Sequence, residues 1–455
     1  MKRFLKKHLL GPWTNRVVAL ALVLLGLVGL IRIYANGAAA LDTITSKELM
    51  NISLSYDLNA LKAGVWDDNR GHGAYSLLND VQLLDRDGAA LPDDAAFYNL
   101  VGVRTLDHNT RYLNDRLVAD PDRAAQYSPL TGVRRNDSPA KTASTTLDTA
   151  LQEQIYAYLT ENALNAIALV ADANSGEVLA AVSCGSEESD LLNRTLRTFS
   201  PGSTQKLTSL LVIAAAGGDL TTPYECKGEF VAEDGQIVRD SGVHGTVDAA
   251  GAFANSCNCW FADRISKLDH ETVNELYRSL GYLVNEETRL TSVDGVHRSM
   301  SSVKLNTVQW DYNSLWNVIG EDTALVNPFD LCGILSAVGD PDARQAHFLS
   351  GETTSAIIDN WPEELKAALP TVNGIMQAAY QNSYIQRGFP DSLLMGKTGT
   401  AEYNSTGDDT GRRFIGLTQS GKVFYLAVED YKVDGVITTD LTLEQMVSDL
   451  VPLIG

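Results

Sequence analysis

The order of the predicted helices and strands restricts the fold of this 455-residue chain more than any other feature. Two β-rich regions stand about 200 residues apart, and the segment between them is mostly helical in pattern. The first region is a hairpin around Asn174-Ser175-Gly176, and the second holds three strand candidates. The expected elements are a helix at 145–164, the hairpin at 166–183, strands at 392–402, 412–419 and 422–432, and a helix at 441–454. This order predicts an α+β fold: an antiparallel five-stranded sheet with flanking helices and an all-helical subdomain.

A basic and then strongly apolar N-terminus predicts a membrane anchor. Residues 17–35 read VVALALVLLGLVGLIRIYA, which is long enough to span a bilayer if Arg32 reaches the interface. Because basic residues precede this run, we expect residues 1–16 to be a cytoplasmic tail and the remainder to lie outside the membrane. A cleaved signal peptide is the alternative, since ANGAAA at 35–40 supplies small residues for cleavage. Both interpretations make the body of the protein extracytoplasmic.

The segment after the anchor differs in pattern from the rest of the chain. Residues 36–140 are mixed and polar, with turns rich in Asp, Asn and Gly, which indicates a small strand-rich N-terminal domain. From residue 141 the periodic pattern becomes much clearer. We therefore expect a second, larger domain at 141–455.

Composition excludes several classes of function. The net charge is −21, although the first 35 residues hold six basic and no acidic side chains, and an acidic body repels nucleic acid. The five cysteines are too few for a disulfide framework, so buried free thiols are expected, with a bridge from Cys226 to Cys257 or Cys259 as the alternative. The seven histidines form no H-E-x-x-H motif, and no paired C-x-x-C is present. We therefore expect no metal and no cofactor.

The stretch LLMGKTGTAEY at 393–403 contains Gly-Lys-Thr, the end of a phosphate-binding loop. Such a loop requires a glycine five residues before Gly396, where this chain has Asp391. It should also open a helix, whereas Gly399 and a polar stretch follow here. The segment is therefore interpreted as a strand that carries Lys397-Thr398-Gly399.

A serine and a lysine open a very apolar helix. The sequence SPGSTQKLTSLLVIAAAGG at 200–218 begins with a Pro-Gly turn and continues almost without polar residues, so the helix is expected to be buried. Ser203 and Lys206 are three residues apart and share one face of the first turn. A lysine whose pKa is lowered by burial and by a second cation can remove the proton of a serine hydroxyl. Ser-x-x-Lys also occurs at Ser138 and Ser301, but neither serine opens an apolar helix.

Two further motifs supply polar groups suited to acyl transfer. Ser256 and Asn258 in GAFANSCNCWFADRI can relay a proton and hold a peptide group, although helix caps commonly have this composition. On the predicted strand, Lys397 can be the second cation, and Gly399 can let a substrate backbone approach closely. The hydroxyls of Thr398 and Thr400 can bind a carboxylate, and a strand N–H can point at an oxyanion.

The order S-x-x-K, S-x-N, K-T-G is the set found in penicillin-binding proteins and class A β-lactamases. Further stretches, including TTLDTALQ, VADANSGEVLAAVS, NRTLRTFSPGSTQK, VHG and GKTGTAE, resemble successive signatures of the transpeptidase domain of class B penicillin-binding proteins. The resemblance covers about residues 145–440. It implies a fold like that of serine β-lactamases and transpeptidases for residues 141–455, and it makes residues 36–140 a reduced pedestal-like domain.

The resemblance also implies an activity, that of a peptidoglycan D,D-transpeptidase inhibited by β-lactams. Ser203 would be acylated by a D-alanyl-D-alanine stem peptide, and Lys206 would be the general base. Ser256 would pass a proton to the leaving amine, while Asn258 would hold the amide of the donor.

The K-T-G strand would complete this implied site. Lys397 would tune the charge, Thr398 and Thr400 would bind the terminal carboxylate, and Gly399 belongs to the same substrate-binding motif. The backbone N–H groups of Ser203 and Thr400 would form the oxyanion hole. The implied partners are stem peptides, β-lactams, the membrane through the anchor and a glycan polymerase of the SEDS type.

Two alternatives remain open at this level. A D,D-carboxypeptidase or serine β-lactamase on the same fold would resolve the acyl-enzyme with water. A non-catalytic scaffold or β-lactam sensor would bind without turnover. An intact set of motifs argues against a scaffold, and the short segment before the anchor argues against a sensor.

Overall fold

The computed structural model describes residues 81–92, 95–97, 141–162, 164–185, 193–293, 296–404 and 407–455. The predicted tail, the predicted anchor and most of the predicted domain at 36–140 lie outside these residues. Within the described part, no helix has both the length and the apolar character needed to cross a bilayer. One compact unit of the chain comprises residues 83–103, 109–116 and 142–455, and the description below concerns this unit.

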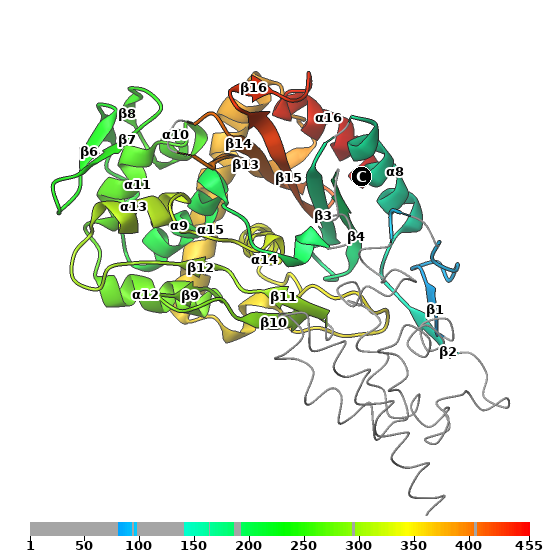
Figure 1. Cartoon of the computed structure of the whole chain (residues 1–455). Coiled ribbons are helices and arrows are strands. Elements are labelled where there is room, and N and C mark those ends of the chain that lie inside the picture. Colours follow the sequence, from blue (N-terminus) through cyan, green and yellow to red (C-terminus); the bar gives the residue numbers. More distant parts are fainter. Residues whose placement is uncertain are drawn as a thin grey trace, which may run out of the picture. The chain divides into compact units, whose positions relative to one another are not determined.

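The central element is an antiparallel sheet in the order β13-β14-β15-β3-β4 (Figure 1). The prediction that the early hairpin and the three late strands form one sheet is confirmed, and the short β16 extends it beside β15. The strands are β3 (Ala166–Asp172), β4 (Val178–Cys184), β13 (Leu393–Glu402), β14 (Thr410–Thr418), β15 (Lys422–Val433) and β16 (Val436–Ile437).

Two glycines form the turns that connect the predicted strands. Gly176 in the β3–β4 turn has φ 81°, and Gly421 in the β14–β15 turn has φ 83°. A side chain is disfavoured in this left-handed region, so glycine fits both turns. The two hairpins then pair through β3 and β15, which joins segments about 250 residues apart.

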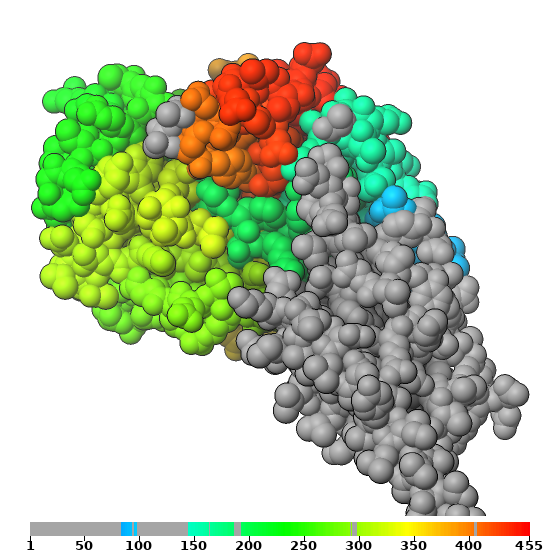
Figure 2. Space-filling view, viewed as in Figure 1, coloured from blue at the N-terminus to red at the C-terminus, as the bar shows by residue number. Residues whose placement is uncertain are grey.

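Helices cover both faces of the sheet, which explains why β3 and β4 are apolar almost throughout. On one face, α8 (Thr149–Glu161) and the C-terminal α16 (Leu443–Ile454) pack over one buried cluster and lie side by side in the space-filling view (Figure 2). Asp148 caps α8 by accepting a hydrogen bond from the Leu151 N–H at 2.9 Å. The opposite face is covered by the larger core, which includes the helical subdomain.

The subdomain between β4 and β13 surrounds one apolar helix, α9, whose residues 206–213 are all buried. This confirms the prediction of a buried helix after Ser203. The other α-helices are α10 (Ala249–Ala254), α11 (Asn258–Ile265), α12 (His270–Ser279), α13 (Tyr312–Ile319), α14 (Pro328–Gly339) and α15 (Glu363–Ala379), with α9 itself at Lys206–Ala215. Short 3₁₀ or π turns are η3 (Arg194–Leu196), η4 (Gly202–Gln205), η5 (Ile357–Asn360), η6 (Tyr380–Tyr384) and η7 (Ile385–Arg387).

The prediction of an all-helical subdomain is wrong, because small two-stranded sheets interrupt the helices. The pairs are β5 (Tyr224–Cys226) with β8 (Gly245–Val247), β6 (Glu229–Val231) with β7 (Ile237–Arg239), β9 (Leu283–Val284) with β12 (Ser302–Val303), and β10 (Leu290–Val293) with β11 (Val296–Ser299). Each strand has two to four residues, which is too short for an alternating pattern to show in the sequence. A further pair, β1 (Val81–Leu84) and β2 (Lys141–Ser144), precedes α8.

All five cysteines are buried free thiols. This confirms the expectation of unbridged cysteines, and the alternative bridge from Cys226 to Cys257 or Cys259 is not formed.

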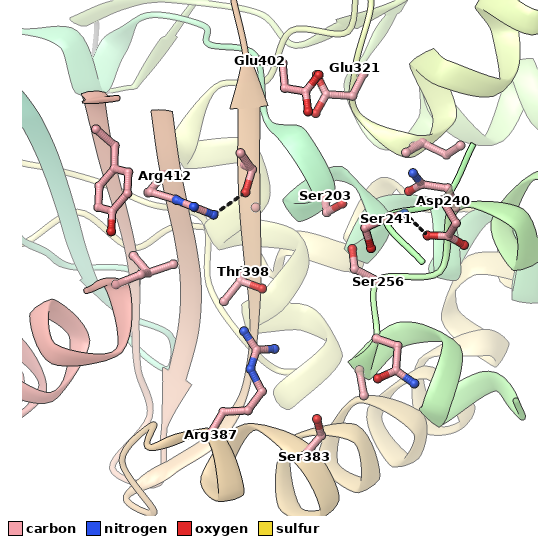
Figure 3. Close-up of a pocket in the computed structure, with 18 of the residues that line it drawn as sticks. Ser203, Asp240, Ser241, Ser256, Glu321, Ser383, Arg387, Thr398, Glu402 and Arg412 are labelled. Atoms are coloured by element: carbon pink, nitrogen blue, oxygen red, sulfur yellow. Dashed lines mark hydrogen bonds between the residues drawn. The ribbon is translucent and has the colours of Figure 1, made fainter. Parts of the chain in front are cut away.

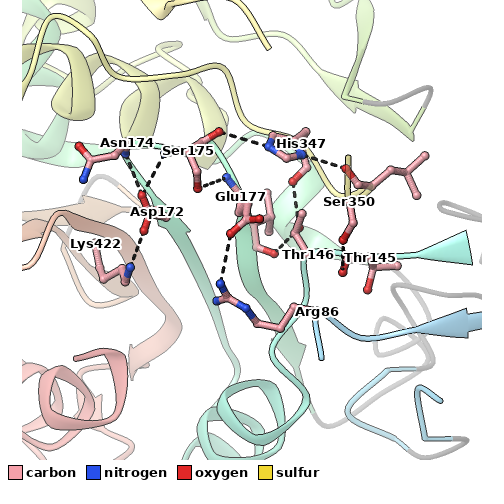
Figure 4. Close-up of polar contacts among 12 residues, drawn as sticks. Arg86, Thr145, Thr146, Asp172, Asn174, Ser175, Glu177, His347, Ser350 and Lys422 are labelled. Atoms are coloured by element: carbon pink, nitrogen blue, oxygen red, sulfur yellow. Dashed lines mark hydrogen bonds and ion pairs between the residues drawn. The ribbon is translucent and has the colours of Figure 1, made fainter. Parts of the chain in front are cut away.

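Polar groups tie residues 347–350 to the start of β4 (Figure 4). The buried Thr146 hydroxyl lies 2.8 Å from the Val178 carbonyl oxygen and 3.1 Å from that of His347, and it can donate to either. The Ser350 hydroxyl donates to the Thr145 carbonyl at 2.7 Å. These side-chain bonds add to the backbone bond from the Val178 N–H to the His347 carbonyl at 2.9 Å.

Replacement of Thr146 by Val keeps the shape of the side chain and removes this hydroxyl. The Val178 and His347 carbonyls would lose a buried donor, so we expect the free energy of unfolding to fall by about 1–3 kcal/mol. Denaturant unfolding measures the change, and Thr353→Val, at an exposed threonine, serves as the control. Equal stability of the two variants would show that the buried hydroxyl contributes nothing.

Candidate active site

A cleft of about 930 Å³ opens where β13 meets the helical subdomain (Figure 3). The predicted residues Ser203, Ser256, Asn258, Thr398 and Thr400 all line it. Gly399 lines it as well, and the two predicted lysines lie buried beneath. The structure therefore brings together every site residue that was predicted from three separate motifs.

The Ser203–Lys206 pair is set by the turn that precedes α9. Ser203 lies in the 3₁₀ turn η4, and Lys206 is the first residue of α9. Side chains three residues apart eclipse each other in a 3₁₀ turn. The Lys206 Nζ accordingly lies 2.9 Å from the Ser203 Oγ.

Lys206 is completely buried and reaches the second motif as well. Its Nζ lies 3.0 Å from the Ser256 Oγ, 2.7 Å from the Ser256 carbonyl oxygen and 2.5 Å from the Asn258 Oδ1. Burial, and then the charge of Lys397, lowers the pKa of Lys206 to about 7. A large fraction of this amine is therefore neutral near pH 7 and can accept a proton.

Ser256 occupies a tight turn between α10 and α11. Its φ of 56° is unusual for a residue with a side chain, and the Cys257 N–H bond to the Ala252 carbonyl at 2.8 Å helps to hold the turn. Asn258 begins α11 and donates from its side chain to the Arg239 carbonyl at 2.9 Å. The helix cap in this motif is Cys257. The side chains of Ser256 and Asn258 are therefore not used for capping and can face the cleft.

Lys397 approaches Ser256 from the opposite side. Its Nζ donates to the Ser256 Oγ at 3.1 Å and to the Thr398 carbonyl at 2.9 Å. Burial, and then the charge of Arg387, lowers the pKa of Lys397 to about 7. The Ser256 hydroxyl is thus held between two buried amines that can exchange protons with it.

The two threonines of β13 have partners that sequence reasoning missed. Arg412 on the neighbouring strand donates to the Thr400 Oγ1 at 2.7 Å, and the Tyr384 hydroxyl lies 3.3 Å from the Thr398 Oγ1. Arg412 faces Thr400 because the two residues are register partners in β13 and β14. The pairing of these strands was not known from sequence, so this cation could not be assigned.

Two glycines bring η4 against β13. A side chain at Gly202 would overlap the Thr400 carbonyl, and one at Gly399 would come within 2.7 Å of the Pro201 carbonyl oxygen. Gly399 was expected to make room for a substrate backbone. This expectation is incomplete, because the space left by the missing side chain is occupied by the η4 turn. This close approach places the backbone of Ser203 next to that of Thr400.

Comparison with known proteins identifies the family. Residues 166–439 match the model of the penicillin binding protein transpeptidase domain, which is more than half of the chain. The chain belongs to the penicillin-binding protein family. The predicted resemblance to class B penicillin-binding proteins is confirmed.

Solved structures of penicillin-binding proteins share the fold. Penicillin-binding protein A from Mycobacterium tuberculosis has a TM-score of 0.63 at 16% identity, over 82% of this chain and 98% of that one. Its penicillin G acyl-enzyme complex has a TM-score of 0.60 at 16% identity, over 82% and 98%. The complex of PBP2 with MreC from Helicobacter pylori has a TM-score of 0.56 at 19% identity, over 70% of this chain and 65% of that one.

Two carboxyl groups also line the cleft of this penicillin-binding protein. Glu321 and Glu402 point toward each other beside Ser203 (Figure 3). Burial and the nearby Glu402 raise the pKa of Glu321 to about 8, so the Glu321 carboxyl group keeps its proton at neutral pH. Neither residue was predicted, because an acidic residue after a motif carries no signal by itself.

Replacement of Gly202 by Ala tests the close approach of η4 and β13. Gly217, after α9, also has a positive φ but would meet no atom within 4 Å, so Gly217→Ala is a matched control. Each change costs about 1–2 kcal/mol for the left-handed backbone. We expect Gly202→Ala to cost measurably more in denaturant unfolding, because the added methyl group overlaps Thr400. Equal costs would contradict the close packing.

Proposed function

We propose that this penicillin-binding protein is a peptidoglycan D,D-transpeptidase that works through an acyl-enzyme on Ser203. The observation that carries the proposal is the fully buried Lys206 amine within 2.9 Å of the Ser203 Oγ and 3.0 Å of the Ser256 Oγ. A neutral amine in this position can take the serine proton and also exchange it with a second hydroxyl. The match to the transpeptidase domain supports the same reaction class.

In the first step, the Ser203 Oγ attacks the carbonyl carbon between the last two D-alanines of a stem peptide. Lys206 accepts the hydroxyl proton, and the carbonyl oxygen becomes an oxyanion facing the backbone N–H groups of Ser203 and Thr400. The C–N bond then breaks and an ester forms on Ser203. The proton reaches the departing D-alanine amine through Ser256, which bridges Lys206 and Lys397.

Positive charge along β13 suits the donor end of the substrate. The terminal carboxylate of the stem peptide would bind the hydroxyls of Thr398 and Thr400, with Arg412 beside them. Arg387 lines the same cleft. Asn258 would hold the amide of the donor through the part of its side chain that faces the cleft.

In the second step, an amine of a neighbouring stem peptide attacks the ester carbonyl. The bond to the Ser203 Oγ breaks, an amide cross-link forms, and the amine proton returns to Ser203 through Lys206. The Glu321–Glu402 pair lies away from Arg387 in the cleft and would attract such an amine before it loses its proton (Figure 3).

The cellular setting is part of the proposal. Residues 17–35 would anchor the chain in the cell membrane, with the N-terminus cytoplasmic and the catalytic domain extracytoplasmic. The partners would be stem peptides, β-lactams and a SEDS-type glycan polymerase. The acyl-enzyme complex of penicillin-binding protein A and the MreC complex of PBP2 support β-lactams and protein partners as the classes to test.

Covalent labelling with a fluorescent penicillin tests the nucleophile. We expect a stable adduct on the full-length wild type and none on Ser203→Ala, which lacks the attacking oxygen. Lys206→Ala should slow labelling about 10²–10⁴-fold through loss of the general base. Mass spectrometry of a peptide digest locates the adduct.

The outcomes separate the alternatives. An adduct that forms and decays within minutes would favour a β-lactamase. Release of D-alanine from a pentapeptide without a cross-linked product, in the presence of an acceptor peptide, would favour a D,D-carboxypeptidase. A folded protein without any adduct would favour the scaffold and overturn the mechanism.

The pH dependence of labelling tests the role of Lys397. Because the pKa of Lys206 is lowered to about 7, the neutral base becomes more abundant as pH rises through 7, and the acylation rate should rise and then level off. Lys397→Gln removes a cation that lowers this pKa, so the midpoint should move to higher pH. Lys422→Gln, at a lysine that pairs with Asp172 on β3, should leave the midpoint unchanged. An unmoved midpoint in Lys397→Gln would contradict the electrostatic role.

A further inference from the structure

Four potential metal ligands meet behind the Ser256 turn, and the proposed reaction uses none of them. They are Cys226, Asp240, His244 and Cys257, and their ligand atoms all lie within 4.8 Å of one another. Cys226 and Cys257 are fully buried, the Asp240 side chain is 1% exposed and that of His244 is 16% exposed. Acidic residues that cluster by chance at a protein surface remain exposed. The burial of these four side chains is instead typical of a metal site that the fold holds in place.

The small sheets of the subdomain bring these residues together. Cys226 ends β5 opposite Gly245 of β8, and His244 directly precedes that glycine. Asp240 directly follows β7, and its N–H donates to the Gly228 carbonyl at 2.9 Å. Cys257 caps the N-terminus of α11. Each ligand is therefore at the end of an ordered element, which fixes its position.

The distances among three of the ligands fit one tetrahedral ion, and the Cys257 Sγ lies within 4.8 Å of each of them. The Asp240 Oδ2 lies 3.5 Å from both the Cys226 Sγ and the His244 Nδ1, and the Cys226 Sγ lies 3.7 Å from the His244 Nδ1. Zinc bonds of about 2.0–2.3 Å give ligand-to-ligand edges of about 3.3–3.8 Å in a tetrahedron. An ion can thus enter the centre with only small movements of the side chains.

We propose that Cys226, Asp240, His244 and Cys257 form a structural zinc site beside the active site. Two thiolates, an imidazole and a carboxylate are a donor set that favours zinc over magnesium or calcium, which prefer oxygen ligands. With four protein ligands, the site has no open position for water or substrate, which makes it structural. On binding, each thiol releases one proton to solvent, two Zn–S bonds form, and no group is oxidised or reduced.

Neighbouring backbone groups complete the site. The Trp260 N–H donates to the Cys257 Sγ at 3.4 Å, and the Cys259 N–H donates to the Asp240 Oδ2 at 3.2 Å. Such bonds orient ligands and support the negative charge of a thiolate. Both donors belong to the first turn of α11.

The ion would affect catalysis by holding the Ser256 turn in position. Cys257 lies between Ser256 and Asn258, and both of these neighbours contact the Lys206 amine. Ser256 keeps an unfavourable φ of 56°, which the surrounding structure must impose. A metal bond to Cys257 would hold this turn in place and connect it to the β5–β8 and β6–β7 sheets, which carry the other ligands.

The sequence could not show this site. Its ligands come from separate segments over 226–257 and form no C-x-x-C or H-E-x-x-H pattern. The expectation of no metal rested on the absence of such motifs, whereas the folded subdomain creates the ligand set.

Metal analysis of the full-length protein tests the proposal. We expect about one zinc per chain by plasma mass spectrometry after purification without a histidine tag, as for a closed four-ligand site. Cys226→Ser and Asp240→Asn should lose most of the zinc. Cys332→Ser, at a buried free thiol in α14, should keep it.

Cobalt replacement provides a second readout that does not depend on activity. Cobalt added to the zinc-free protein should give the absorption bands of a tetrahedral thiolate complex, and His244→Ala should weaken them. Zinc removal by a chelator should also lower the melting temperature and slow penicillin labelling, while Ser203→Ala should retain the metal and lose labelling. This last variant separates failure of the metal site from failure of the proposed function.

Two outcomes would overturn the proposal. One is a folded wild type without zinc that also fails to take up cobalt. The other is a Cys226–Cys257 disulfide in the purified protein, detected by mass spectrometry without reduction, because a disulfide removes both thiolates.

Discussion

The burial of the Lys206 amine is the interaction on which the rest of this site depends. An ammonium group taken out of water loses its hydration, and the nearby Lys397 adds repulsion, so the neutral form becomes accessible near pH 7. The same amine is surrounded by oxygen atoms of Ser203, Ser256 and Asn258, which satisfy its hydrogen bonds. The chain therefore holds a base that is buried away from bulk solvent, and this requires the apolar α9 helix and the large core on that side of the sheet.

The proposed catalytic groups come from two parts of the structure with different roles. The sheet supplies Lys397, Thr398 and Thr400 from the part of β13, Met395 to Glu402, in which every residue has a register partner on β14. The subdomain supplies Ser203, Ser256 and Asn258 from helix starts and one strained turn. Glycines 202 and 399 join the two bodies, since a side chain at either position would hold them apart.

The strained turn at Ser256 links this arrangement to the four ligands behind it. The turn joins two short helices, and the neighbouring hairpins are only a few residues long. Small elements of this kind commonly need a metal or a disulfide to become rigid. The ligand cluster directly adjoins this turn, because Cys257 follows Ser256 in the chain.

The sequence by itself determined the sheet, the buried helix and the residues that gather at the cleft. Hairpin glycines, apolar runs and the spacing of Ser203 and Lys206 are local signals, because turns, burial and helical faces depend on nearby residues. Tertiary structure alone decided that Arg412 lies against Thr400, that Glu321 meets Glu402, and that Cys226 lies near Cys257. Each of these contacts joins segments that are distant in sequence, and no local pattern encodes the pairing of strands or the packing of helices that creates them.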